Sequence, residues 1–213
     1  DLSVHGDSMF HLTGDSGGIP NVVYMADNHV REYREREYDL LFGAHSWGFR
    51  HDEPNFRWLP CAYDQQTHYE WQSEWGGRVI DVGFVGVLYP NRLAVIDTLR
   101  SWGLSVALAT GRVYHESNDL YNVCKVALCV SYNGDVPARV FEGMAQGCVV
   151  LADPQFDLAK LGLESGKQLL TFTDPDSLRV AVRIALSEQG EAIAEAGKEW
   201  VRGHSWRARA EEI

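Results

Sequence analysis

The sequence predicts an α/β protein with a doubly wound parallel sheet in its C-terminal half. After residue 78, continuous apolar runs alternate with segments of helical periodicity. Such runs are typical of strands buried on both faces, and strands that alternate with helices form parallel sheets. We expect a short or truncated first domain at residues 1–77 and a second domain with closing C-terminal helices at 78–213. A polar stretch that ends at Gly76-Gly77 separates them.

Short β-like runs predict the strands of the first domain. They lie at residues 1–5, 22–25, 39–43 and 56–60, separated by glycine, asparagine and charged residues. The charged stretch 31–37 predicts a solvated helix or turn, because its acids and bases largely cancel.

The second domain shows a clearer alternation. Strands are predicted at residues 81–86, 104–109, 125–130, 148–152 and 168–172. Helical spacing predicts a helix over Arg92–Trp102 that stops at Gly103. Pro137 is expected to open a second helix that runs to Gln146, and Asp174-Pro175 to cap a third.

Charge and cysteine content narrow the class of protein. The net charge is −11, of which −8 falls on residues 1–77 and −3 on residues 78–213. An acidic field repels phosphate backbones, so it disfavours a nucleic-acid partner without excluding one. No apolar run reaches the ~18–20 residues of a membrane span. The four cysteines lack metal-ligand spacing, and we expect them to be reduced and structural in a cytoplasmic protein.

The ends of the predicted strands indicate where a ligand would bind. In an open parallel sheet, ligands bind beyond the carboxyl ends of the strands. The loops there contain Gly86, Thr110–Arg112, Tyr132–Asp135 and Asp153-Pro154. Glycine lets the backbone approach a ligand, and the helix that follows offers free N–H groups to an anion.

Arg139 and Glu142 lie three residues apart near a helix start, so they share a face. The guanidinium fork suits a diphosphate, and a carboxylate can accept hydrogen bonds from both hydroxyls of a ribose. Together they suit a nucleotide. An ordinary surface pair on a helix is the alternative that spacing leaves open.

Four segments resemble CgeB-like, group 1 glycosyltransferases. Residues 81–92 (DVGFVGVLYPNR) resemble the opening of that family's C-terminal nucleotide-sugar domain, and residues 136–151 (VPARVFEGMAQGCVVL) its RxFE segment. The ending His204–Arg207 is similar to the family's closing HTYxxR. Residues 22–29 with 58–60 resemble the end of its N-terminal domain. The order and spacing of the motifs are kept from about residue 20 onward.

The resemblance implies a GT-B fold, in which two Rossmann-like domains face each other across a cleft. It implies transfer of a sugar from a nucleotide-diphosphate sugar to an acceptor hydroxyl, with no bound metal and no further cofactor. Glu142 takes the position of the second glutamate of the family's E-x7-E element, which contacts the donor ribose. The first position holds Gly134, and the adjacent Asp135 is a candidate substitute.

The expected site has a donor side and an acceptor side. A metal-free site stabilises the leaving diphosphate with arginine, backbone N–H groups and a helix dipole. The expected donor-binding residues are Gly86, Arg92, Arg112, Asp135, Arg139 and Glu142. The base-type groups for the acceptor hydroxyl are His29 and Asp27, although Asp27-Asn28 is equally suited to capping a helix.

Two other functions stay open at this point. Gly134 and the short first half favour a non-catalytic nucleotide-sugar-binding or interaction module. A nucleotide-sugar epimerase of GT-B fold is the other, but it needs a pair of acid and base groups around one sugar, and no such pair can be assigned. The donor base, the sugar and the acceptor are not encoded in any motif found.

Overall fold

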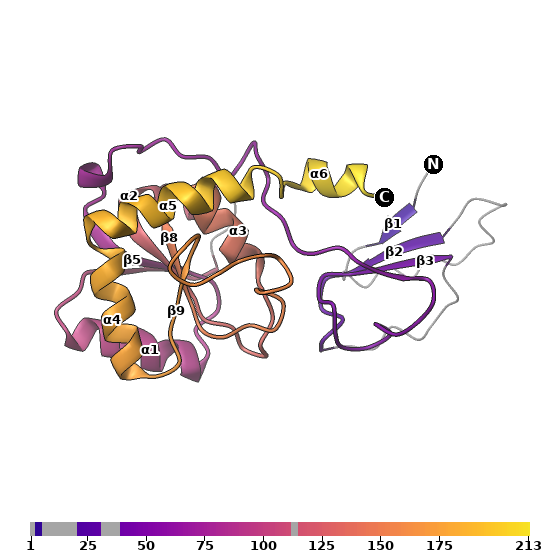
Figure 1. Cartoon of the computed structure of the whole chain (residues 1–213), viewed down its shortest axis with the longest axis horizontal. Helices are drawn as coiled ribbons and strands as arrows, with labels where there is room; N and C mark the ends of the chain where they lie inside the picture. Colours follow the sequence, from indigo (N-terminus) through magenta and orange to yellow (C-terminus); the bar gives the residue numbers. More distant parts are fainter. Residues whose placement is uncertain (1–2, 6–20, 31–38, 112–114) are drawn as a thin grey trace. The chain divides into compact units, whose positions relative to one another are not determined.

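The computed structural model describes residues 3–5, 21–30, 39–111 and 115–213, and the chain divides into two compact units, 1–61 and 62–213. Each unit contains a parallel sheet (Figure 1). The division falls earlier than Gly76-Gly77, because residues 62–78 pack on the second unit. Asn122, for example, accepts a hydrogen bond from Trp71 N at 2.8 Å and donates one to Tyr69 O at 3.0 Å.

The described sheet of the first unit has the strand order β1-β2-β3-β4, with all pairs parallel. The strands are β1 (Ser3–His5), β2 (Asn21–Met25), β3 (Leu40–Gly43) and β4 (Phe56–Trp58). The four expected strand positions are thereby confirmed. The charged stretch 31–37, expected to be a solvated helix or turn, lies outside the described residues.

The sheet of the second unit has the order β6-β5-β7-β8-β9, again with all pairs parallel. Its strands are β5 (Ile80–Val85), β6 (Val106–Ala109), β7 (Cys124–Cys129), β8 (Val149–Ala152) and β9 (Leu170–Thr171). The chain enters at β5, goes to one side for β6 and then to the other for β7. The strand order therefore reverses between β5 and β7, and such a switch point is where doubly wound sheets bind ligands.

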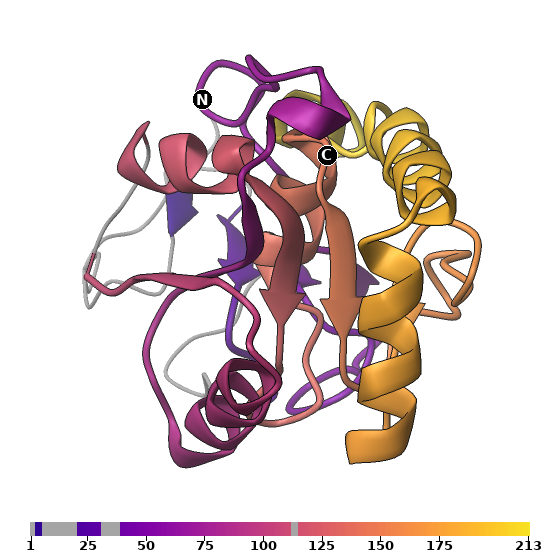
Figure 2. The same ribbon diagram turned by 90° about the vertical axis from the view of Figure 1, so that its left-hand side faces the viewer.

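Helices cover both faces of this second sheet (Figures 1 and 2). They are α1 (Pro90–Ser101), α2 (His115–Val123), α3 (Ala138–Ala145), α4 (Pro175–Ala185), α5 (Glu188–Val201) and α6 (Trp206–Glu211), preceded by a 3-10 turn at Trp75–Gly77. The expected helices at 92–102 and 137–146 correspond to α1 and α3, whereas α2 had no sequence prediction. Pro137 is the N-cap of α3, so the helix begins one residue later than expected.

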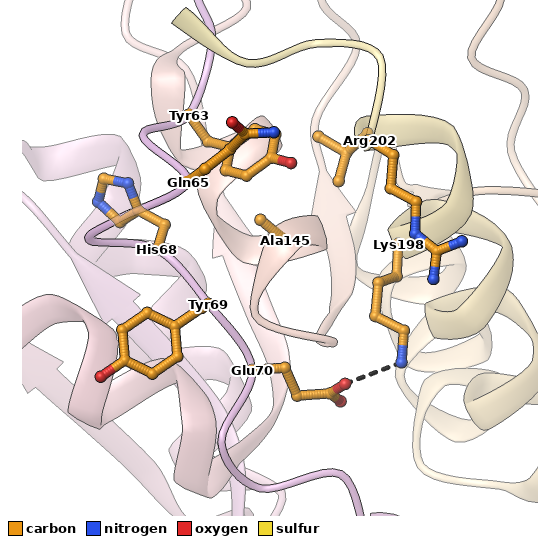
Figure 3. A pocket seen from close by; sticks show the side chains of 9 residues that line it. Tyr63, Gln65, His68, Tyr69, Glu70, Ala145, Lys198 and Arg202 are labelled. Atoms are coloured by element: carbon orange, nitrogen blue, oxygen red, sulfur yellow. Dashed lines mark hydrogen bonds and ion pairs between the residues drawn. The ribbon is translucent and has the colours of Figure 1, made fainter. Parts of the chain in front are cut away.

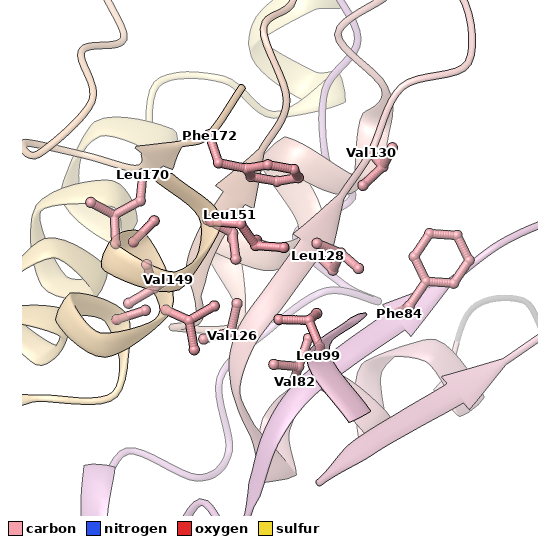
Figure 4. Packing of buried hydrophobic residues seen from close by; sticks show 14 of the residues in the cluster. Val82, Phe84, Leu99, Val126, Leu128, Val130, Val149, Leu151, Leu170 and Phe172 are labelled. Atoms are coloured by element: carbon pink, nitrogen blue, oxygen red, sulfur yellow. The ribbon is translucent and has the colours of Figure 1, made fainter. Parts of the chain in front are cut away.

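Alternating side chains of the strands divide between the two faces. One set packs with α1 and α4 in the main core (Figure 4), and it includes Val82, Phe84, Val126, Leu128, Val149 and Leu151. The other face carries small residues under α2 and α3. A Cβ at Gly143 of α3 would lie 2.6 Å from Ala127 Cβ, so glycine lets this helix lie directly on β7. The doubly wound prediction is confirmed.

The start of α4 agrees with the sequence prediction. Asp174 accepts a hydrogen bond from Ser177 N at 2.8 Å and completes a capping box.

All four cysteines are free. Burial raises the pKa of the Cys124, Cys129 and Cys148 thiols to about 12, whereas Cys61 is only half-buried. Within the described ranges, no helix has the length and apolar character needed to cross a membrane.

Candidate functional site

The carboxyl ends of β5 and β7 carry the candidate site of the second unit. Gly86 follows β5 and has a φ of +135°, a conformation that side chains rarely adopt. Its N–H donates to Ala109 O at the end of β6 at 3.0 Å. The strand ends and their loops are thereby held at one edge of the sheet. Arg112, expected at this edge after β6, lies outside the described residues.

Arg139, in the first turn of α3, extends to Gly86. A Cβ at Gly86 would lie 2.7 Å from Arg139 Nη1, and the guanidinium carbon lies 5.4 Å from the centre of the Phe84 ring. Arg139 Nε and Nη2 are buried, and neither has a hydrogen-bond partner among the described residues. Buried guanidinium N–H groups are normally paired, so these two donors have the chemistry of an anion site.

Arg92 of α1 lies nearby but is engaged with the backbone. Its Nε donates to Val130 O and its Nη1 to Val87 O, both at 2.9 Å, so it joins the loops that follow β7 and β5. Burial and the neighbouring Arg139 lower the pKa of Arg92, while Asp135 and Asp153 oppose the shift. Two guanidinium groups therefore lie at this edge, together with the carboxylates of Asp135 and Asp153.

The loop after β7 is held by Asp153, one of the residues expected at this edge, and by Ser131, which no sequence motif singles out. Ser131 Oγ donates to Asp135 Oδ1 at 2.5 Å and accepts from Gly134 N at 2.7 Å. Ser131 N donates to Asp153 Oδ1 at 2.8 Å. Their position directly after strands was the available signal. The Asp135 carboxylate is thus oriented by a hydroxyl within its own loop.

The loop after β7 favours glycine at position 134. Its φ is +84°, and a Cβ there would lie 2.5 Å from the Phe156 ring. Phe156 N also donates to Gly134 O at 3.0 Å. A glutamate at this position would strain the backbone and would have to displace the Phe156 ring, which is 69% exposed.

Glu142 lies one turn after Arg139 on α3, but the two side chains have different neighbours. Glu142 Oε1 lies 3.7 Å from His68 Nε2, and no hydrogen-bond donor to its carboxylate is found in the described part of the chain. Burial raises the pKa of Glu142, while His68 and Arg139 lower it. Arg139 and Glu142, both in the described part of the chain, do not form an ion pair with each other. This argues against the alternative that they are an ordinary surface pair on a helix.

The first unit positions His29 and Asp27 in the turn after β2. Asn28 is fully buried there, accepts from His45 N at 3.1 Å and donates to Trp47 O at 2.8 Å. The turn after β2 is thereby joined to the turn after β3. The His29 ring packs edge-on against His45, with the ring centres 4.3 Å apart. The side chain of Asn28 thus bonds to the turn after β3. The capping role expected for Asp27-Asn28 concerns a helix at residues 31–37, which lie outside the described residues.

A cavity of about 390 Å³ lies between residues 63–70 and helices α3 and α5, and His68, the neighbour of Glu142, is among its lining residues (Figure 3). Its acidic group is already paired, since Glu70 bonds Lys198 at 2.8 Å and Arg78 at 3.0 Å. This cavity therefore lacks the unpartnered cation that distinguishes the edge at Gly86.

A family model described as glycosyl transferase-like matches residues 76–213. The chain belongs to this family. A search of curated proteins gives no match.

Solved structures of glycosyltransferases share the fold of this family member. The HepE protein of Anabaena, in complex with UDP and glucose, superposes with a TM-score of 0.69 at 14% identity, covering 92% of this chain and 70% of its own. Sucrose-phosphate synthase of Thermosynechococcus elongatus has a TM-score of 0.62 at 14% identity, covering 91% and 66%.

The pneumococcal O-GlcNAc transferase GtfA, in complex with UDP and GlcNAc, has a TM-score of 0.58 at 12% identity, covering 91% of this chain and 51% of its own. The glycosyltransferase-like chain thus spans from half to about two thirds of these proteins. At such identities the likeness establishes the parallel α/β fold of GT-B glycosyltransferases.

Proposed function

We propose that this chain binds a nucleotide-diphosphate sugar and transfers the sugar, of hexosyl type, to an acceptor hydroxyl without a metal ion, as a CgeB-like member of its family. The observation that carries the proposal is Arg139, whose buried Nε and Nη2 lack partners beside Gly86 in the described structure. Both residues lie at the switch point between β5 and β7.

A diphosphate would supply the hydrogen-bond acceptors that the buried N–H groups of Arg139 lack in the described structure. A buried donor without a partner costs about 1–3 kcal/mol, and more when the group is charged. Phosphate oxygens accept the parallel N–H groups of arginine, and the uncapped N-terminus of α3 adds backbone donors. The same groups stabilise the charge that develops on the diphosphate when the sugar–phosphate bond breaks.

Glu142 supplies the ribose contact in this proposal. Its carboxylate has acceptor capacity that no described donor uses, and it lies one helical turn from the phosphate ligand Arg139. Asp135 is proposed at the transferred sugar, since Gly134 has no side chain. Arg112 stays a proposed phosphate ligand, and His29 with Asp27 the proposed base for the acceptor hydroxyl.

The structures of similar fold support a nucleotide-sugar ligand. The HepE structures contain UDP-glucose or UDP with glucose, and the GtfA structure contains UDP with GlcNAc. We infer the same ligand class for this chain, with the base and sugar to be found by experiment.

A second candidate is a nucleotide-sugar-binding module without transferase activity. Gly134 favours it, because its φ of +84° disfavours a side chain where the resemblance places a first glutamate. Such a module would keep Arg139 and Glu142 and bind the nucleotide without turnover.

Calorimetry with UDP, GDP, ADP and TDP and their glucose derivatives tests the proposal. We expect the nucleotides of one of these four bases to bind. Arg139→Ala should weaken that binding at least ~10-fold, the equivalent of about 1.4 kcal/mol. Unchanged affinity in Arg139→Ala would place the diphosphate elsewhere. Mass spectrometry separates the two candidates. After the protein is incubated with its sugar nucleotide, a transferase releases free nucleoside diphosphate as the sugar passes to water or to an added acceptor, whereas a binding module leaves the sugar nucleotide intact.

A further inference from the structure

His68 reaches the second unit's candidate site from outside the family's motifs. It lies on residues 62–78, the segment that packs across α2 and α3. Tyr69 N donates to Asn118 of α2 at 3.1 Å, which holds the chain next to His68 against that helix. His68 and Glu70 point to opposite sides of this segment (Figure 3). Glu70 bonds Lys198 of α5, whereas His68 lies beside Glu142 of α3.

A backbone hydrogen bond defines which nitrogen of His68 carries the proton. Asp64 N donates to His68 Nδ1 at 3.2 Å, so Nδ1 is an acceptor in this structure. The neutral ring then carries its proton on Nε2. Nε2 is the atom that faces Glu142 Oε1 at 3.7 Å.

The distance between these two atoms is too long for a hydrogen bond between them. N–H···O bonds have lengths of about 2.7–3.2 Å, so the Nε2–H donor and the carboxylate acceptor lie side by side without bonding. Both side chains are mostly buried, with 11% and 20% of their surfaces exposed. No other hydrogen bond to Nε2 or to the Glu142 carboxylate is found within residues 21–30, 39–111 and 115–213.

A hydroxyl group fits this pair, because it accepts one hydrogen bond and donates another. We propose that His68 is a second ribose ligand, whose Nε2–H donates to the hydroxyl that in turn donates to Glu142. The inference rests on the proposed function, since it requires the ribose to lie at Glu142. It makes His68 a residue that selects ribonucleotides over deoxyribonucleotides, because a missing hydroxyl leaves a buried donor and acceptor unpaired.

Two substitutions separate this role from a merely structural one. In His68→Asn the amide oxygen replaces Nδ1 and keeps the contact with Asp64 N, but the donor toward Glu142 is lost. In His68→Gln the terminal amide reaches the place of Nε2 and keeps a donor there. Gln66→Ala, an exposed neighbour on the same segment, is the matched control.

Calorimetry compares UDP, GDP or ADP, whichever the wild type binds, with its 2′-deoxy and 3′-deoxy forms. We expect His68→Asn to lose about 5- to 10-fold in affinity for the ribonucleotide, the effect of one hydrogen bond, and to bind at least one deoxy form as the wild type does. His68→Gln should recover most of the loss. Gln66→Ala should bind like the wild type. Thermal unfolding of each variant checks that the fold is kept.

The failures of the two proposals give different results. If His68→Asn binds the ribonucleotide as tightly as the wild type, or loses the same factor for every deoxy form, His68 is not a ribose ligand while the proposed function stands. If the wild type does not distinguish ribonucleotide from deoxynucleotide, the ribose subsite is absent although the diphosphate binds. If no nucleotide binds the wild type, the proposed function itself fails.

Discussion

The guanidinium of Arg139 lies in the space that a side chain at Gly86 would occupy, since a Cβ there would be 2.7 Å from Arg139 Nη1. The two residues come from different crossovers of the sheet, one after β5 and the other after β7. Because Gly86 has no side chain, the guanidinium of Arg139 on α3 can lie against the end of β5.

Gly86→Ala should displace Arg139 and weaken nucleoside diphosphate binding. The φ of +135° adds a strain of about 1–3 kcal/mol to the folded state. Gly103→Ala is the matched control, since Gly103 has a φ of +83° but no atom near its Cβ position. Both variants should lose stability in urea unfolding, and only Gly86→Ala should lose affinity in calorimetry. Equal affinities would show that Arg139 does not depend on Gly86.

Arg139→Met should abolish diphosphate binding and yet raise the stability of the ligand-free protein by ~1 kcal/mol. The substitution removes a buried charge whose Nε and Nη2 have no described partner and replaces it with an apolar chain. Arg92→Met is the contrasting variant, because it leaves Val87 O and Val130 O without their donor. Its stability should fall by about 2–4 kcal/mol. Urea unfolding curves measure both, and a destabilised Arg139→Met would contradict the assignment.

Gly134→Glu, which introduces the glutamate that the resemblance places at this position, should destabilise the protein rather than raise its activity. Phe156 lies 2.5 Å from the Cβ position, and the φ of +84° is strained for any side chain. Adding Phe156→Ala should recover the part of the lost stability that comes from the clash, with the backbone strain remaining. Denaturant unfolding of the single and double variants checks this. A Gly134→Glu protein as stable as the wild type would mean that the loop rearranges freely.

His204 should make the protein less stable in mild acid. Its ring stacks on Trp200 at 3.9 Å between ring centres, and its Nδ1 lies 2.8 Å from Arg209 Nη2, which can only donate. Burial, followed by the charge of Arg209, lowers the pKa of His204 to about 4, while Glu212 opposes the shift.

The unfolded chain takes up the proton near pH 6.5, and the native state takes it up only near pH 4. The stability contributed by the neutral ring is therefore complete above pH 6.5 and is lost as the pH falls toward 4. The loss is at most ~3 kcal/mol, and solvent screening reduces it. Thermal unfolding at pH 7.5 and 5.0 should show a smaller drop for His204→Gln than for the wild type. Identical drops would assign the acid sensitivity to other groups.

The sequence by itself determined the strands of both sheets, the helices other than α2, and the edge of the second sheet at which we propose that a ligand binds. Local patterns carry this information: apolar runs specify β5 to β9, and Asp174-Pro175 specifies the start of α4. Because all the strands are parallel, residues in the loops that follow them, such as Gly86 and Asp135, lie at one edge. The residue types of Arg139 and Glu142, with the resemblance to glycosyltransferases, indicated the ligand class.

Only the tertiary structure decided which of these side chains are available to a ligand. Arg92 and Arg139 look equivalent in the sequence, but Arg92 is used by two backbone carbonyls and Arg139 is not. His68 precedes the matched family segment and gained its place beside Glu142 only when residues 62–78 packed across α2 and α3. Contacts between segments far apart in the chain depend on packing and backbone hydrogen bonds that no local pattern encodes, and this is the physical reason that the sequence did not reveal them.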